Sequence, residues 1–276
     1  MRIAVIGGTG MAGRHTVQAI KGAGHQTAVI SRSQGVDVTT GQGLDDALLG
    51  VDVVVDVTNL LADDIEGTRR LFGAATRNLL AAEKRARVKH HILLSIVGIE
   101  RIEANAHYAG KRMQEELIQA GGVPYTIQRA TQFHEFAEMV VGWTRQGDVA
   151  EIPPILVQPV AAADVGHLLA EIAGGKPRGR AVDLAGPGPE DLVDMAQRTL
   201  AARGQSIRLV PTWRSGVYGI EAAGEVLLPD PGARLATTTF DEWLGQQGER
   251  RHAHGVDRTS HRVAAQSTAE RLVERE

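Results

Sequence analysis

The glycines near the N-terminus have the spacing of a phosphate-binding turn. Gly7, Gly10 and Gly13 form a GxxGxxG pattern that follows an apolar run and precedes a segment with helical periodicity. We expect Gly7 to make a tight turn, Gly10 to let backbone N–H groups approach a pyrophosphate, and Gly13 to let helix and strand pack closely. Thr9 and Met11, which lie between these glycines, are predicted to contact the same cofactor. Because no Gly-Lys-Ser/Thr sequence follows, a Walker A loop is excluded.

A basic residue stands where the second strand is expected to end. An NAD-binding site usually has an acidic residue there, which holds the ribose 2′-hydroxyl. This chain has Ser31, Arg32 and Ser33 instead, and Arg14 adds a second positive charge at the start of the first helix. A guanidinium between hydroxyls suits a 2′-phosphate through charge-assisted hydrogen bonds. We therefore predict NADP as the cofactor, with NADPH preferred over NADH; the alternative is that Arg32 is a solvated loop residue.

The elements that must position these residues alternate between short β-branched runs and longer helical patterns. Such alternation predicts an α/β fold with right-handed crossovers and a buried parallel sheet. The strands are expected at residues 2–6, 27–31, 53–57, 91–95 and 125–129, and the clearest helix at about 64–87.

The chain of 276 residues is predicted to form one domain followed by a tail. Residues 1–245 are expected to be a single NAD(P)-binding domain, with a core of about 1–150 and a substrate lobe of about 151–245 in which Pro-rich segments loosen the pattern. Residues 246–276 are polar, which predicts a mobile tail.

Composition excludes several classes of protein. A formal charge of -3 disfavours nucleic-acid binding, and the absence of cysteine excludes disulfides and Cys-type zinc sites. The sequence has no signal peptide and no apolar run of about 20 residues, so we expect a cytoplasmic protein that does not span a membrane, as a monomer or homodimer. His90 and His91 begin a strand, where neighbouring side chains point to opposite faces, so we predict no metal site there.

Seven segments carry a specific resemblance when they are taken in order. They are GGTGMAGR, SRS after the second strand, HHILLSIVGIE, HYAGKRMQEELI, GGVPYTIQRATQF, QPVAAADVGHLL and TTTFDEWL, and they span about residues 1–244. Their order and spacing resemble the atypical short-chain dehydrogenase/reductase superfamily, in its NmrA-like, NAD(P)H-binding branch. The resemblance implies a Rossmann-type, doubly wound sheet, a nicotinamide cofactor and, in members that are enzymes, hydride transfer.

The same resemblance implies a catalytic set with one departure. In typical members a serine polarises the carbonyl, a tyrosine exchanges the proton, and a lysine four residues later binds the nicotinamide ribose and lowers the tyrosine pKa. Ser95, Tyr108 and Lys111 match these types, but Tyr108 precedes the lysine by three residues and His107 takes the four-residue position. Three interpretations stay open: Tyr108 acts as the acid from a rotated position, His107 does so because imidazole titrates near neutral pH, or neither does.

Further contacts are expected around this set. Asn59 follows a predicted strand at the carboxyl edge of the sheet, where doubly wound folds bind ligands, so we expect it to contact the cofactor. By resemblance, Gln132 lines the nicotinamide and Phe133 the substrate. Phe133 and Trp143 are predicted to form an apolar substrate pocket, with core packing as the alternative role of these rings.

Two classes of function remain. The first is an NAD(P)H-dependent oxidoreductase that transfers hydride to a small-molecule substrate, an apolar carbonyl or quinone-like acceptor. The alternative is a non-catalytic NAD(P)-binding redox sensor of the NmrA type, which the altered His107/Tyr108 arrangement favours. A sugar-nucleotide epimerase is disfavoured by the short C-terminal lobe and the missing four-residue Tyr–Lys spacing.

Overall fold

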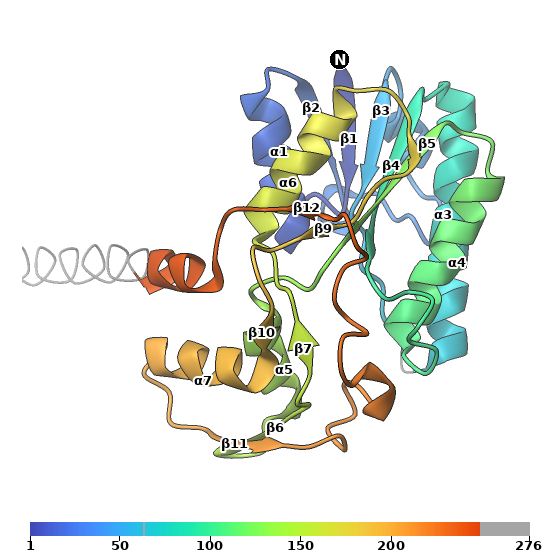
Figure 1. Ribbon diagram of the computed structural model, residues 1–276. Coiled ribbons are helices and arrows are strands. Elements are labelled where there is room, and N and C mark those ends of the chain that lie inside the picture. Colours follow the sequence, from blue (N-terminus) through green and yellow to red (C-terminus); the bar gives the residue numbers. More distant parts are fainter. Residues whose placement is uncertain (63, 249–276) are drawn as a thin grey trace, which may run out of the picture.

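A parallel sheet lies at the centre of the molecule, a computed structural model that describes residues 1–62 and 64–248 (Figure 1). Within these residues the sheet has eight strands, in the order β12-β9-β5-β4-β3-β1-β2 with β8 beside β5, and every pair is parallel. The strands are β1 (Arg2–Ile6), β2 (Gln26–Ile30), β3 (Val53–Asp56), β4 (His90–Ile96), β5 (Tyr125–Ala130), β8 (Gly179–Arg180), β9 (Leu184–Ala185) and β12 (Arg234–Leu235). Each of the five strands expected from the sequence is found to within one residue at either end.

Helices cover both faces of this sheet (Figure 1). One face is covered by α1 (Met11–Gly22) and α6 (Ala162–Ala173), and the other by α3 (Ile65–Ala86) and α4 (Ala106–Ala120). Shorter turns of helix are α2 (Leu44–Ala47), η1 (Arg32–Gln34) and η2 (Ile220–Ala222). This is the predicted Rossmann-type doubly wound fold. No helix in the described part of the chain is long and apolar enough to cross a bilayer.

The sequence of β1 explains why the sheet is buried on both sides. Ile3 and Val5 pack into the cluster that includes α1 and α6, whereas Ala4 and Ile6 pack into the cluster that includes α3. All four side chains are at most 1% exposed. A strand buried on both faces must be apolar throughout, which is the continuous pattern of the sequence.

The order of the strands reverses at β1, and such a reversal is where open α/β sheets bind their ligands. β1 pairs with β2 on one side and with β3 on the other, so the crossovers from β1 and from β2 run to opposite faces of the sheet. Open α/β sheets bind their ligands outside the carboxyl ends of the strands at such a switch point. The turn after β1 lies at this position.

A smaller lobe lies beyond the carboxyl ends of the strands (Figure 1). Its elements are α5 (Phe136–Thr144), α7 (Leu192–Ala202), the parallel pair β6 (Val149–Ile152) and β11 (Arg208–Pro211), and the antiparallel pair β7 (Leu156–Val157) and β10 (Glu190–Asp191). They share a core that includes Ile152, Met195 and Phe240. The segment from Glu151 onward is divided between lobe and sheet, because α6, β8, β9 and β12 return to the sheet. The expected tail lies outside the described residues except for 246–248.

Helix α6 packs closely against α1, the helix that follows the turn after β1. A Cβ atom added to Gly166 of α6 would lie 2.6 Å from the carbonyl carbon of His15 and 2.8 Å from the backbone nitrogen of Thr16, both on α1. The two helix backbones therefore touch at a glycine, where no side chain separates them. This contact holds the first helix in place on the sheet.

Candidate functional site

The sequence-predicted site residues come from six segments at the carboxyl edge of the sheet and one in the lobe. They lie in the turn after β1 and the first turn of α1 (Gly7, Thr9, Gly10, Met11, Gly13), after β2 (Ser31, Arg32), after β3 (Asn59), near the end of β4 (Ser95), on the first turns of α4 (His107, Tyr108, Lys111), after β5 (Gln132, Phe133) and on α5 (Trp143).

The glycine turn is shaped to hold an anion. Gly7 adopts φ +79°, and the N–H of Gly10 donates to the carbonyl of Gly7 at 2.9 Å. A Cβ on Gly13 would lie 2.1 Å from that same carbonyl oxygen, so only glycine fits there. No side chain of the described residues caps α1, whose N-terminal N–H groups have no partner within the helix. Such N–H groups bind phosphates, and this cradle fits a pyrophosphate.

A cationic segment stands directly beside the turn. The N–H of Gly7 donates to the carbonyl of Ile30 at 2.8 Å, so the residues after Ile30 begin next to the glycines. The Ser31 and Ser33 hydroxyls lie 2.9 Å apart with Arg32 between them in the sequence. The Arg32 side chain is exposed and makes no hydrogen bond or ion pair with the residues that the structure describes. It is therefore available for a ligand phosphate.

Lys111 is buried in a network of its own. Its Nζ donates to the carbonyl of Thr58 at 3.2 Å, to the carbonyl of Leu94 at 2.9 Å and to Oε1 of Gln114 at 2.9 Å. Gln114 Nε2 in turn donates to Asp56 at 2.7 Å. Burial lowers the pKa of Lys111 to about 8, against the raising effect of Asp56. An ammonium has three hydrogens, and all three are used here. A contact between Lys111 and a ribose therefore requires the loss of one of these bonds.

Tyr108 has neutral partners. Its side chain is 1% exposed, and its hydroxyl accepts from the Tyr218 hydroxyl at 3.1 Å and from Gln132 Nε2 at 3.3 Å. Burial, and then Tyr218, raise the pKa of Tyr108 well above its ordinary value. The Lys111 hydrogens point elsewhere, so the phenol lacks the ammonium that lowers the tyrosine pKa in the typical arrangement.

His107 is also unlike an acid. Burial, and then the charge of Lys111, lower its pKa to about 4, so the imidazole is neutral near pH 7. Its ring lies 6.4 Å from that of Tyr108 and 6.1 Å from that of Phe72. A neutral imidazole has no acidic proton to give. The pKa shifts of both residues are unfavourable to acid catalysis near pH 7, and the three interpretations of the proton donor stay open.

Three buried polar atoms around Tyr108 have no hydrogen-bond partner among the described residues. They are Oγ of Ser95, Nδ1 of His107 and Oε1 of Gln132. Buried polar atoms are nearly always paired, so each unpaired one needs an explanation. These three atoms come from β4, α4 and the segment after β5.

Two features of this site were not predicted from the sequence: the cap formed by Asn105 and the contact between Tyr108 and Tyr218. Asn105 precedes α4, and its Oδ1 accepts from the N–H groups of His107 at 3.0 Å and Tyr108 at 3.3 Å. Asparagine before a helical pattern is a capping signal that the sequence already carried. Tyr218 stands 110 positions after Tyr108, and no local pattern connects the two.

The two predicted substrate rings pack against different parts of the molecule. Phe133 is partly buried against the sheet core. Trp143 is 57% exposed, and its ring lies 6.2 Å from Phe136 in the lobe. Phe136 also lies 6.2 Å from Tyr218, so Phe136 rather than Trp143 reaches the hydroxyl cluster.

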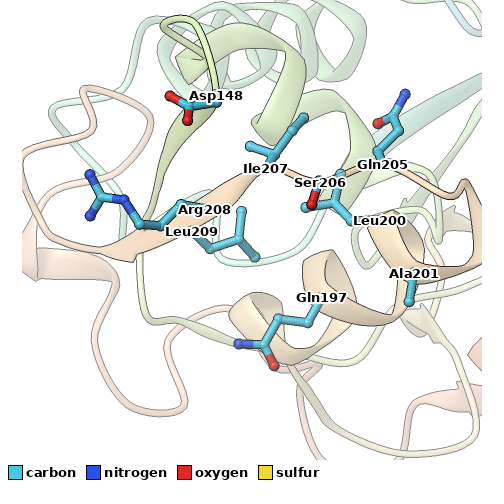
Figure 2. Close-up of a pocket in the computed structure, with 9 residues that line it drawn as sticks. All are labelled: Asp148, Gln197, Leu200, Ala201, Gln205, Ser206, Ile207, Arg208 and Leu209. Carbon is cyan, nitrogen blue, oxygen red and sulfur yellow. The ribbon is translucent and has the colours of Figure 1, made fainter.

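A groove of about 510 Å³ is separate from all of these residues. Figure 2 shows it in the lobe, between α7 and β11. It is lined by Asp148, Gln197, Leu200, Ala201, Gln205, Ser206, Ile207, Arg208 and Leu209. Most of these side chains are exposed, and none was predicted as a site residue. The candidate site is therefore the carboxyl edge of the sheet rather than this groove.

Comparison with known proteins identifies the family of the chain. The model of the NmrA-like family matches residues 1–173. Photosystem II assembly factor Ycf39 of Cyanophora paradoxa is 26% identical over an alignment of 149 residues. The alignment covers 49% of this chain and 46% of that protein, so the match spans about half the length of this curated relative.

Two similar solved structures agree with the fold. The NADPH-dependent quinone oxidoreductase of Escherichia coli, complexed with NADPH, has a TM-score of 0.68 at 16% identity, over 89% of this chain and 99% of that one. The triphenylmethane reductase of Citrobacter sp., complexed with NADP(H), has a TM-score of 0.65 at 16% identity, again over 89% and 99%. At such identities the likeness shows the fold.

Proposed function

Because this chain belongs to the NmrA-like family, we propose that it is an NADPH-dependent oxidoreductase that transfers hydride to a small, apolar, quinone-like acceptor. When bound, the cofactor supplies the hydride. The observation that carries the choice of acceptor is the state of Tyr108, whose buried hydroxyl has neutral partners and a raised pKa.

The cofactor half of the proposal rests on fit. The glycine turn presents the N-terminus of α1 to a pyrophosphate, and a Cβ at Gly13 would collide with the backbone of Gly7 and Gly8 that shapes the turn. Arg32 and Ser31 stand beside it for a 2′-phosphate, which is the reason to expect NADPH over NADH. Asn59 is exposed directly after β3, where it can reach the nucleotide. In this proposal these residues bind and orient the cofactor.

The acceptor half rests on proton supply. Reduction of a simple ketone creates an alkoxide, which needs a strong acid at the moment of transfer. A quinone gives a stable aromatic product that takes its proton from water. Neither Tyr108, with a raised pKa, nor His107, with a pKa of about 4, is set to act as that acid near pH 7. The quinone-like acceptor is therefore favoured over the simple carbonyl, and one of the similar structures is a quinone oxidoreductase.

A non-catalytic NAD(P) sensor is the second candidate. The observation in its favour is that Lys111 donates all three ammonium hydrogens to protein acceptors, which leaves none for a cofactor or substrate. In addition, one relative is named as an assembly factor rather than an enzyme.

A binding and turnover experiment separates the two. Binding of NADPH and NADH to the purified protein is measured by fluorescence, and NADPH oxidation is then followed with 1,4-naphthoquinone and with hexanal. We expect tighter binding of NADPH and oxidation by the quinone but not by the aldehyde. Tight NADPH binding without oxidation by either acceptor would support the sensor. Failure to bind either nucleotide would overturn both candidates.

A further inference from the structure

The hydroxyl of Tyr108 uses both of its lone pairs within the protein. It accepts from the Tyr218 hydroxyl at 3.1 Å and from Nε2 of Gln132 at 3.3 Å. A phenol has one hydrogen to donate and two lone pairs that accept. With both lone pairs occupied in this arrangement, the Tyr108 hydrogen is left to donate.

Tyr218 is held firmly in this arrangement. It belongs to the lobe segment after β11, and its side chain is 8% exposed. Its ring meets that of Tyr108 edge-on, with centroids 6.0 Å apart and planes at 78°, and the ring of Phe136 lies 6.2 Å away. Edge-to-face contacts of this kind fix the direction of each ring.

Asn105 connects the two tyrosines through the backbone. Its Oδ1 accepts from the N–H groups at the start of α4, including that of Tyr108, while its Nδ2 donates to the carbonyl of Val217 at 3.1 Å. One side chain thus fixes both the helix that carries Tyr108 and the segment that carries Tyr218.

We propose that Tyr218 and Gln132 are positioning residues that direct the hydroxyl hydrogen of Tyr108 toward the oxygen of a quinone-like acceptor. They take the orienting role that the lysine has in the typical arrangement, since Lys111 is engaged with Thr58, Leu94 and Gln114. Tyr108 acts as a hydrogen-bond donor and keeps its proton. This inference rests on the proposed function.

The consequence for the reaction is electrostatic. Negative charge develops on the acceptor oxygen as hydride arrives, and a donor aimed at that oxygen stabilises it. Tyr218 acts through Tyr108 and does not touch the acceptor. Removal of the Tyr218 hydroxyl frees one lone pair of Tyr108, and its hydrogen is then no longer restricted to the productive direction.

The test compares tyrosine-to-phenylalanine variants, which keep each ring. The variants are Tyr108→Phe, Tyr218→Phe and the double variant. Tyr125→Phe is the matched control, because Tyr125 is on β5 and packs against a different cluster. The readouts are kcat/KM for 1,4-naphthoquinone and the Kd for NADPH. We expect kcat/KM to fall about tenfold in Tyr218→Phe and more in Tyr108→Phe. The Kd for NADPH stays unchanged in all variants.

Coupling between the two tyrosines identifies positioning. The double variant is expected to match Tyr108→Phe alone, because Tyr218 acts only through Tyr108, whereas two independent structural effects would add. If Tyr218→Phe does not fold, Asn105→Ser serves instead: serine keeps a helix cap but loses the amide donor to Val217. As a single substitution, Asn105→Ser is expected to lower kcat/KM about threefold. Combined with Tyr108→Phe, it is expected to lower kcat/KM no further than Tyr108→Phe does alone.

The outcomes separate the two proposals. If the wild type binds NADPH but reduces no quinone, the proposed function fails and the positioning role fails with it. If the wild type reduces the quinone and Tyr218→Phe does so equally well, or the two effects add, only the positioning role is overturned.

Discussion

The two halves of the candidate site differ in how much of their polar chemistry is already used. On the cofactor side, the N-terminus of α1 is uncapped and Arg32 makes no bond to the described residues. On the acceptor side, Lys111 has three protein partners and the Tyr108 hydroxyl has two. The polar groups of the cofactor side are therefore free to bind a ligand. Those of the acceptor side mainly bind other groups of the protein.

This difference indicates which substitutions affect binding and which affect stability. A group without a protein partner contributes little to the folded state and much to a complex, whereas a buried group with partners leaves them unsatisfied when it is removed. Mutations in the cofactor half should therefore change nucleotide affinity, and mutations beside α4 should change the free energy of unfolding.

Gly13→Ala should have the largest effect. The new Cβ would lie 2.1 Å from the Gly7 carbonyl oxygen and 2.7 Å from the Gly8 Cα, both backbone atoms, so the turn must move. We expect NADPH affinity to fall by at least about 100-fold, together with a loss of about 1–3 kcal/mol in stability. Calorimetry measures the binding. Gly22→Ala, on the same helix with open space around it, is the control. Equal affinities in the two variants would contradict the assignment of the turn.

Lys111→Met tests the acceptor side, where we expect a substitution to change stability more than nucleotide affinity. It removes the ammonium from Thr58, Leu94 and Gln114 and leaves these buried acceptors unpaired. We expect a loss of about 3 kcal/mol in the free energy of unfolding, measured by urea denaturation, with a smaller change in NADPH affinity. Lys176→Met, in an exposed loop, should match the wild type. The opposite result, weak NADPH binding at full stability, would make Lys111 a ribose ligand.

Arg32→Ala tests the free cation. If its guanidinium binds the 2′-phosphate, the preference for NADPH over NADH should fall by about 1–3 kcal/mol while stability stays constant. The Kd values for both nucleotides measure this preference. Arg208→Ala removes an exposed arginine in the lobe and should leave the preference intact. An unchanged ratio in Arg32→Ala would mean that the residue is only solvated.

The smallest effect concerns pH. Because the pKa of His107 is about 4 in the folded chain and 6.5 in the unfolded one, only the unfolded state takes up this proton between those values. Stability should therefore fall as pH drops from about 6.5 to 4. His107→Gln should make the decline shallower in urea titrations across this range. His167→Gln, on the exposed side of α6, is the control, and its stability should fall with pH as that of the wild type does. If the His107 imidazole is solvated, the stability of His107→Gln should fall in the same way.

Much of the sheet could be predicted because its signals are local. The apolar runs locate the strands, and the long helix begins at its cap Asp64 and ends at Arg87 in the left-handed conformation, as the expected range 64–87 implies. The glycine spacing likewise identifies a turn whose atoms are all neighbours in the sequence.

The acceptor side could not be predicted in the same way. The partners of Lys111 and Tyr108 come from other elements, as far away as Tyr218, and the sequence does not show which polar groups will meet. The spacing of Tyr108 and Lys111 on α4 predicts a departure from the typical arrangement. It did not show that Lys111 would bond to the ends of β3 and β4 instead.

The glycine contact between α6 and α1 has a consequence for biosynthesis. The helix whose N-terminus forms the nucleotide cradle is packed against residues 162–173, which follow every strand that supports the cradle. Until the ribosome has released this later helix, one side of β1, β3 and β4 has only α1 to cover it. The turn proposed to hold the nucleotide therefore gains its full support late, after more than half of the chain has been translated.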